Sequence, residues 1–232
     1  MRRQIEPELL DHLPASDPRA MESRGDLRRL NAWMGNAAVL ERILRSESGD
    51  RLIRRVVDLG AGDGTFMLCL AGRLAALWRP VEVLLLDRQA MISAGTLGKF
   101  AELGWNAAAV QADALDWLEN GSPRQCDLIV ANLFLHHFPE PMLQKMFREA
   151  AGRTAVFLSC DPRRSLAALA AAKSIWAIGC NGVTRHDACA SVRAGFAGRE
   201  LSSLWPQETG WRLRETSAGL FSHSFLAEKG RP

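Results

Sequence analysis

The residue types best suited to holding a charged ligand are concentrated between Val56 and Thr65, in the sequence VVDLGAGDGT. Two β-branched residues lead into Asp58, and three glycines then follow at alternate positions. Glycine lets a backbone turn sharply and approach a ligand closely because it has no Cβ. A dinucleotide-binding turn has the pattern G-x-G-x-x-G and faces a pyrophosphate, whereas here Thr65 stands where the third glycine would be. Asp58 would repel a phosphate and attract an ammonium group, so the pattern favours a ligand that carries one.

This run resembles motif I (D/E-x-G-x-G-x-G) of the class I S-adenosylmethionine-dependent methyltransferases. The resemblance implies that Asp58 faces the methionine amino group of S-adenosylmethionine. It also implies that the backbone of Gly60, Ala61 and Gly62 approaches the cofactor, and that Gly64 allows close packing of the strand against the helix. The alternative is an unrelated strand–turn–helix whose glycines coincide with the motif by chance.

A further acidic residue, Asp87, ends the apolar run Val83–Leu86. A carboxylate at the tip of a second strand can accept both hydroxyls of a ribose. The resemblance extends the predicted cofactor site to Arg88. It also implies that Asp113 accepts from the adenine amino group while the N–H of Ala114 meets a ring nitrogen. For both acids the alternative is that they only cap the helix that follows.

The segment Cys126–Pro139 resembles the fourth strand and exit loop of the methyltransferases of ubiquinone and menaquinone biosynthesis and of their small-molecule relatives. The resemblance adds Asn132 to the predicted cofactor site. The segment lacks N/D-P-P-Y/F, the motif with which amine-directed DNA and protein methyltransferases hold their nitrogen. No cysteine follows a proline, as the nucleophile of the cytosine C5 enzymes does. These absences favour a small-molecule acceptor.

Two adjacent histidines, His136 and His137, follow this strand. We expect no metal here, because adjacent side chains point in different directions and no carboxylate or third ligand lies at a useful spacing. Either one imidazole lines the methyl-transfer site or both make structural hydrogen bonds. His137 is our first candidate catalytic residue.

The second candidate catalytic residue is His186, in the sequence R-H-D that precedes S-V-R. This pattern, together with Asp161–Ser165, resembles the same branch of methyltransferases. An imidazole titrates near neutrality, which suits a base that takes a proton from a phenol or an enol. The alternative is a helix N-terminus in which these polar residues serve as caps and surface pairs.

Strands and helices alternate from residue 55 onward, which predicts a parallel sheet covered on both faces. Two closing strands flank Gly219, and in the methyltransferases that resemble this chain the last strand is inserted antiparallel. The expected fold is therefore an α/β, doubly wound, mostly parallel seven-stranded sheet of the Rossmann-like methyltransferase type. The predicted strands are 56–59, 81–86, 107–111, 127–132, 154–159, 211–216 and 222–227, and the predicted helices between them are 66–77, 91–103, 114–120 and 142–150.

Two further segments are expected to be helical. Residues 1–50 carry an amphipathic stripe that predicts an N-terminal helical cap, with a break at Gly35. Residues 165–205 read as two or three helices, among them 188–196 and 200–204. They leave the carboxyl end of a strand, where ligands bind in such sheets, so we expect a lid over a substrate pocket. The chain 1–232 is expected to form one domain.

Composition limits the partners. Hydrophobic residues make up 47% and charged residues 24%, which is typical of a globular protein, and a net charge of +3 is too small to indicate nucleic-acid binding. The longest apolar stretch, Leu166–Cys180, is too short to cross a bilayer, and the N-terminus lacks the apolar core of a signal peptide. Five cysteines without a C-x-x-C pair predict free thiols in a reducing compartment. We expect a cytoplasmic monomer or homodimer that contacts neither membrane nor nucleic acid.

The sequence predicts a methyltransferase that uses S-adenosylmethionine on a small molecule. O-methylation of a phenolic or polyketide-like acceptor of secondary metabolism, by direct SN2 transfer, is the first interpretation. C-methylation of a quinone precursor is the second. A non-catalytic relative that only binds the cofactor also stays open. A nucleotide-dependent oxidoreductase is disfavoured because Thr65 replaces the third glycine.

Overall fold

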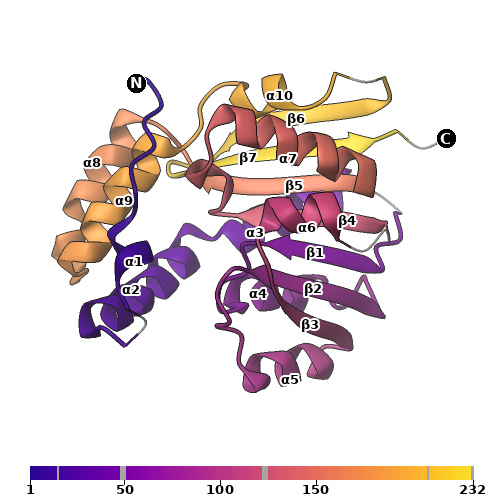
Figure 1. Cartoon of the computed structure of the whole chain (residues 1–232), viewed down its shortest axis with the longest axis horizontal. Coiled ribbons are helices and arrows are strands. Elements are labelled where there is room, and N and C mark those ends of the chain that lie inside the picture. The colour runs from indigo at the N-terminus through magenta and orange to yellow at the C-terminus, as the bar shows by residue number, and fades with distance from the viewer. Residues whose placement is uncertain (15, 48–50, 122–124, 208, 231–232) are drawn as a thin grey trace.

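A seven-stranded sheet forms the centre of the protein in the computed structural model (Figure 1), which describes residues 1–14, 16–47, 51–121, 125–207 and 209–230. The strand order is β3-β2-β1-β4-β5-β7-β6, with β1 to β5 pairing in parallel and β7 running antiparallel between β5 and β6. This order confirms the predicted doubly wound, mostly parallel fold. The strands are β1 Arg55–Leu59, β2 Val81–Asp87, β3 Trp105–Gln111, β4 Cys126–Asn132, β5 Thr154–Pro162, β6 Trp211–Ala218 and β7 Ser222–Lys229.

Helices cover both faces of the sheet because successive side chains of a strand point to opposite sides. On β5, Val156 and Leu158 belong to the apolar cluster formed with α3, α4 and α5. The residue between them, Phe157, packs against Phe147 of α7 in the cluster formed with α6, α7 and α10. These helices are α3 Asn36–Glu47, α4 Thr65–Leu74, α5 Ala94–Glu102, α6 Ala114–Asn120, α7 Glu140–Arg153 and α10 Glu200–Leu204.

The N-terminal helices and the helices that follow β5 gather at one end of the sheet, on the left in Figure 1. This is the end where the parallel strands finish, and it holds α8 and α9 next to α1 and α2. Gly35, with φ of 67°, ends α2 in the left-handed region and produces the predicted break before α3. Residues 15 and 48–50 of the predicted cap lie outside the described residues. The elements at this end are α1 Leu9–His12, α2 Pro18–Met34, α8 Leu166–Ser174, the 3-10 turn η2 Ile175–Ile178 and α9 Gly182–Ala194, with the 3-10 turn η1 Leu135–His137 following β4.

Capping residues explain where the helices differ from the predicted boundaries. The helix predicted to begin at residue 91 begins after Ser93, whose hydroxyl accepts from the N–H of Thr96. The lid helix predicted at 188–196 begins at Gly182, because the side chain of Asn181 accepts from the N–H of Thr184. That helix ends before Gly195, where a Cβ would lie 2.1 Å from a backbone oxygen. In the described ranges, no helix has the length and apolar character needed to cross a membrane.

Candidate active site

The glycine loop after β1 is held in a conformation that glycine adopts easily. Gly60, Gly62 and Gly64 have φ of 72°, 57° and 78°, in the left-handed region that side chains disfavour. The N–H of Gly60 donates to the carbonyl of Leu86 at 2.9 Å. The N–H of Gly62 donates to the carboxylate of Asp87 at 2.8 Å. The end of β2 therefore fixes the loop, and a Cβ built at Gly62 meets nothing within 4 Å, so the loop is open on that side.

Asp58 lies near the end of β1, two residues before the first glycine of this loop. Its side chain is buried, and its Oδ2 has no hydrogen-bond partner among the described residues. Burial, together with the nearby negative charge of Asp87, raises the pKa of Asp58 well above its usual range. A buried carboxylate oxygen without a partner carries a large desolvation cost unless a donor or a cation meets it. Asp58 lines the main cavity, so its position fits the ammonium group of a ligand bound there.

The main cavity, with a volume of about 520 Å³, extends from the glycine loop to the helices at the end of the sheet. Its floor contains Asp58, the glycine loop and Asn132, whose side-chain oxygen accepts from Asn36. Small apolar residues of α8 and α9 form one wall and residues of α2 form another. The apolar wall residues on α8 and α9 are Ala168, Ala171, Ala172, Ala188 and Val192.

Asp161, at the end of β5, organises the exit loop of β4. Its Oδ1 accepts from the backbone N–H groups of Phe134 and His136 at 3.1 and 3.2 Å. The same oxygen lies 3.0 Å from Nδ1 of His136. Leu133, the residue before Phe134, has φ of 51°. This value is uncommon for a residue other than glycine, and it costs conformational energy. The loop is therefore held in a strained conformation that turns both histidines toward the end of the cavity.

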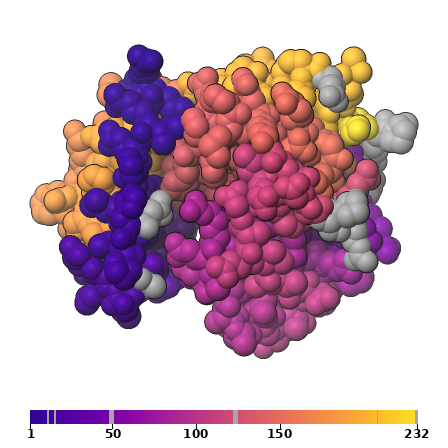
Figure 2. Space-filling view, in the orientation of Figure 1, coloured from indigo at the N-terminus to yellow at the C-terminus, as the bar shows by residue number. Residues whose placement is uncertain are grey.

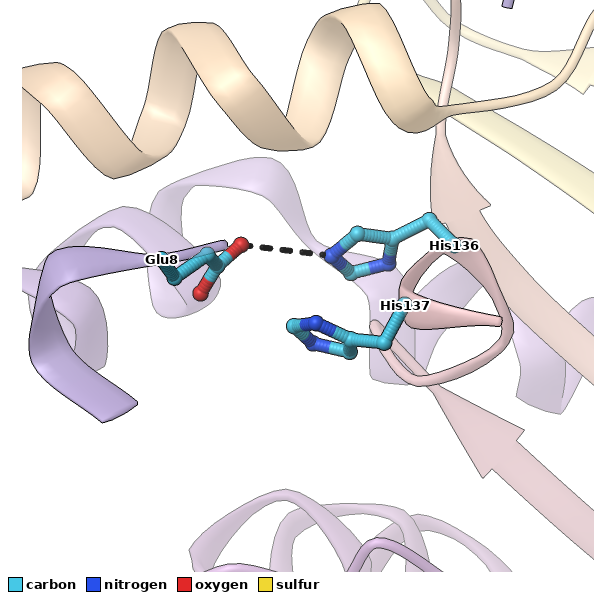
Figure 3. Close-up of side chains that lie close together, drawn as sticks. All are labelled: Glu8, His136 and His137. Atoms are coloured by element: carbon cyan, nitrogen blue, oxygen red, sulfur yellow. Dashed lines mark ion pairs between the residues drawn. The ribbon is translucent and has the colours of Figure 1, made fainter. Parts of the chain in front are cut away.

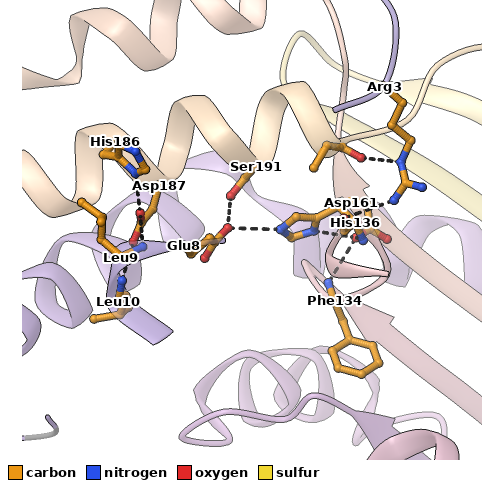
Figure 4. A network of polar contacts seen from close by, with 11 residues as sticks. Arg3, Glu8, Leu9, Leu10, Phe134, His136, Asp161, His186, Asp187 and Ser191 are labelled. Atoms are coloured by element: carbon orange, nitrogen blue, oxygen red, sulfur yellow. Dashed lines mark hydrogen bonds and ion pairs between the residues drawn. The ribbon is translucent and has the colours of Figure 1, made fainter. Parts of the chain in front are cut away.

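His136 is buried between two carboxylates, as Figure 4 shows. Its Nδ1 faces Asp161, and its Nε2 lies 3.5 Å from Oε1 of Glu8. Burial opposes the charged form, but the interactions with the carboxylates of Asp161 and Glu8 outweigh it and raise the pKa of His136 to about 9. For Glu8, burial acts to raise the pKa, but His136 outweighs it and lowers this pKa to about 2. The three side chains form a chain of carboxylate, imidazolium and carboxylate from β5 to the N-terminal segment.

His137 has the opposite electrostatic situation. Burial, and then the positive charge of His136, lower the pKa of His137 to about 4. The two rings lie 4.1 Å apart between centroids. His137 is therefore a neutral imidazole at neutral pH, and it lines the cavity.

The N-terminal segment brings Glu8 to this site. Arg3 donates to the backbone carbonyls of Ala194, His136 and Phe138 at 2.7, 3.1 and 2.9 Å. The N–H groups that begin α1 donate to the two carboxylate oxygens of Asp187 on α9 at 2.8 and 3.0 Å. Figure 2 shows this indigo segment running down the face of the molecule beside the orange helices. The segment thus closes one side of the cavity, with Glu8 facing inward.

Some of the predicted cofactor-site residues line the main cavity, and others lie outside it. Asp87 bonds to the glycine loop and to the N–H of Gln89, and Arg88 is exposed. Asp113 caps α6 by accepting from two backbone N–H groups, and Ala114 is buried behind it. These four residues do not line the main cavity. The predicted residues that do line it are Asp58, Gly60, Ala61, Gly62, Asn132 and His137.

His186 does not reach the cavity. Its side chain is 46% exposed and its Nδ1 pairs with Asp187 at 3.0 Å. The residues of α9 that line the cavity are Ala188, Ser191 and Val192, which share one face of the helix. A residue two positions before Ala188 points to another face, because a helix turns by 100° per residue. The geometry therefore supports the alternative interpretation of His186, a surface pair.

Glu8 lines the cavity beside the two histidines, and sequence reasoning did not select it. The sequence showed no carboxylate at a useful spacing from His136 and His137, but in the structure the carboxylate of Glu8 reaches them from the N-terminal segment (Figure 3). Ligand atoms of all three residues lie within 4.8 Å of one another. The contact depends on the docking of α1 against Asp187, for which local spacing gives no signal.

The fold and the glycine loop match a known family. Residues 56–155, which run from the second residue of β1 to the second residue of β5, match the model of a methyltransferase domain. This part of the chain is similar to a methyltransferase domain. The match covers both the glycine loop and the two histidines after β4, and it confirms the resemblance drawn from motif I. Among curated protein sequences, none matches this chain significantly.

Solved methyltransferases share this fold over most of the chain. The plantazolicin methyltransferase BpumL in complex with SAH has a TM-score of 0.62 at 12% identity, covering 93% of this chain and 92% of that one. An O-methyltransferase family protein from Burkholderia thailandensis has a TM-score of 0.61 at 18% identity, covering 93% of this chain and 61% of that one. Magnesium protoporphyrin IX methyltransferase from Synechocystis PCC 6803, with bound SAH, has a TM-score of 0.52 at 14% identity over 85% and 83%. At these identities the likeness shows the fold of the methyltransferase domain.

Proposed function

We propose that this protein transfers the methyl group of S-adenosylmethionine to a hydroxyl oxygen of a small aromatic acceptor. The observation that carries the proposal is a single cavity that joins Asp58 and the glycine loop to the neutral imidazole of His137. The first end suits a cationic amino-acid group and the second suits a hydroxyl group. A methyl transfer needs both ligands in one enclosed space.

The cofactor site is proposed in two parts. Asp58, with its unpartnered oxygen, would hold the methionine ammonium, and the backbone of Gly60, Ala61 and Gly62 would approach the methionine chain beside Asn132. The ends of β2 and β3 would hold the nucleoside. The residues proposed for that second part are Asp87, Arg88, Asp113 and Ala114.

The acceptor site is proposed between α2, α8 and α9. Alanines on α8 and α9 leave room for a flat ring, and apolar walls bury such a ring favourably. Trp33 and Phe221, whose rings lie 5.6 Å apart, add an aromatic surface. The segment 165–205 then acts as the lid of one domain that spans 1–232. The O-methyltransferase family of the Burkholderia thailandensis protein is consistent with an oxygen acceptor.

The proposed reaction is a direct displacement. The acceptor oxygen attacks the methyl carbon from about 3 Å, the oxygen–carbon bond forms, and the carbon–sulfur bond breaks with its electrons passing to the sulfonium sulfur. The hydroxyl proton passes to a ring nitrogen of His137. The protein mainly holds the two reactants in line, because the sulfonium is already a good leaving group.

We place the protein in the cytoplasm, since all five cysteines are free thiols. We further propose a monomer or homodimer, and no nucleic-acid partner because the net charge is only +3. The test of the function is incubation with methyl-labelled cofactor and a panel of phenols, polyketide-like enols and quinone precursors, followed by NMR of the product. Transfer to oxygen supports the proposal. Transfer only to carbon identifies the quinone-type reaction instead, and cofactor binding without transfer to any acceptor contradicts an enzymatic role.

A further inference from the structure

Three potential metal ligands converge at the acceptor end of the cavity. Glu8 comes from the N-terminal segment, and His136 and His137 come from η1 (Figure 3). All three line the cavity. Two imidazoles and one carboxylate make up a donor set that binds Zn²⁺ in catalytic sites, where the fourth position stays open.

The separation of Glu8 and His136 suits two ligands of one ion. Oε1 of Glu8 lies 3.5 Å from Nε2 of His136, longer than an ordinary hydrogen bond between such groups. Two ligands of a tetrahedral ion, each bonded at about 2.0–2.2 Å, lie roughly 3.4 Å apart. The ligand atom of His137 lies within 4.8 Å of the other two, so binding one ion with them requires this partly buried ring to move closer.

Further contacts orient these side chains as they do around bound metals. Nδ1 of His136 is held by Asp161 at 3.0 Å, which leaves Nε2 directed at Glu8. A carboxylate behind a histidine ligand in this way fixes the ring and raises its basicity. The hydroxyl of Ser191 donates to Glu8, and Asp187 holds the backbone directly after Glu8.

We propose that Glu8, His136 and His137 form a binding site for a divalent cation of the Zn²⁺ type, with an open position toward the cavity. The proposal rests on the proposed function for its role. A cation there would bind the acceptor oxygen as the anion, the hydroxyl proton leaving to water, while His137 serves as a ligand in place of a base. The N-terminal segment would then complete the site only when it is docked.

The site can be tested without cofactor or acceptor, using Co²⁺ as the probe. Protein treated with a chelator and then dialysed is titrated with Co²⁺ by calorimetry, and the visible absorption of the bound ion is recorded. We expect one ion per chain, with the intense bands of a four- or five-coordinate site. Addition of azide should shift these bands, because the open position accepts an outside ligand.

Variants locate the site. Glu8→Gln and His137→Gln should each weaken Co²⁺ binding at least tenfold, whereas His186→Gln, a histidine outside the cluster, should bind as the wild type does. Circular dichroism confirms that each variant is folded. Absence of stoichiometric Co²⁺ binding, unchanged binding in both cluster variants, or bands that azide does not shift would each overturn the proposal. A protein that binds Co²⁺ as expected but methylates nothing retains the metal site and loses the proposed function.

Discussion

At the scale of single residues, burying the ionised carboxylate of Asp58 lowers the stability of the folded protein. A carboxyl whose pKa is raised in the folded protein binds its proton more tightly there than in the unfolded chain. Burial and the charge of Asp87 raise the pKa of Asp58 in this way. Stability from this group is therefore greatest at low pH and falls as the pH rises through the unfolded value of about 3.9 toward the folded value. At neutral pH an ionised Asp58 destabilises the protein without cofactor.

Asp58→Asn should stabilise the cofactor-free protein while weakening cofactor binding. Removal of the buried charge is expected to stabilise by roughly 1 kcal/mol, a rise of about 2–4 °C in Tm for a chain of this size. Loss of the charged acceptor should lower cofactor affinity roughly tenfold or more, since hydrogen bonds to charged groups contribute about 1.5–3 kcal/mol. Thermal melts between pH 5 and 8 and calorimetric titrations check both effects. A variant that is less stable and binds equally well would show that Asp58 is only structural.

His137 and His186 both lie near the end of the sheet, but only His137 lines the cavity. His137→Ala should reduce turnover about 10²–10⁴-fold with nearly unchanged cofactor affinity, because it removes the imidazole that meets the acceptor. His186→Ala is the matched control and should keep normal turnover, since its side chain points away from the cavity. Steady-state rates of the two variants provide the comparison. Equal losses in both variants would contradict the placement of the acceptor.

At the scale of elements, the tips of the strands hold the loops that bind ligands. Asp87, at the end of β2, accepts from the glycine loop after β1, so it supports that loop as well as the proposed ribose site. Asp87→Ala should cost about 1.5–3 kcal/mol of cofactor affinity while the fold survives, because the residue lies at a strand tip outside the core. Calorimetric titration of the folded variant measures this. An unchanged affinity would leave Asp87 with a capping role alone.

The N-terminal segment is the second such element, and Asp187 is one of the residues that hold it in place. Asp187→Ala leaves the first two N–H groups of α1 without their acceptors. We expect the free energy that holds the segment in place to fall by about 1–2 kcal/mol. Amide hydrogen exchange in residues 3–12 should become faster, while Arg2→Ala, at an exposed neighbouring position, should leave it unchanged. Exchange followed by mass spectrometry measures both variants. Slow exchange retained in Asp187→Ala would show that other contacts fix the segment.

The sequence predicted the elements where local chemistry is sufficient. Apolar runs located the strands, and the turn at Gly35 was visible because glycine favours its backbone conformation. The start of α9 was missed because it depends on a hydrogen bond from Thr184 to the side chain of Asn181. The direction of His186 was missed because the start of the helix sets which face each residue occupies.

At the scale of the whole molecule, the cavity forms where segments distant in sequence meet. The sheet contributes the glycine loop and the exit of β4, and the N-terminal helices and the lid contribute the walls. The resemblance to methyltransferases was enough to predict a mostly parallel seven-stranded sheet with an antiparallel closing strand, which the structure confirms. It was not enough to predict that Glu8 joins the histidines, because that contact follows from the packing of α1 and α2 on α9.

The central claim is that this chain binds S-adenosylmethionine through Asp58 and the glycine loop. Calorimetric titration with S-adenosylmethionine, its demethylated product and NAD tests it most directly, with Asp58→Asn as the control. We expect both methionine ligands to bind the wild type and to raise its Tm. At a hundredfold excess over Kd, binding should increase the free energy of unfolding by about 2.7 kcal/mol. The variant should bind them roughly tenfold more weakly or worse. Binding of NAD with no binding of either methionine ligand would contradict the account.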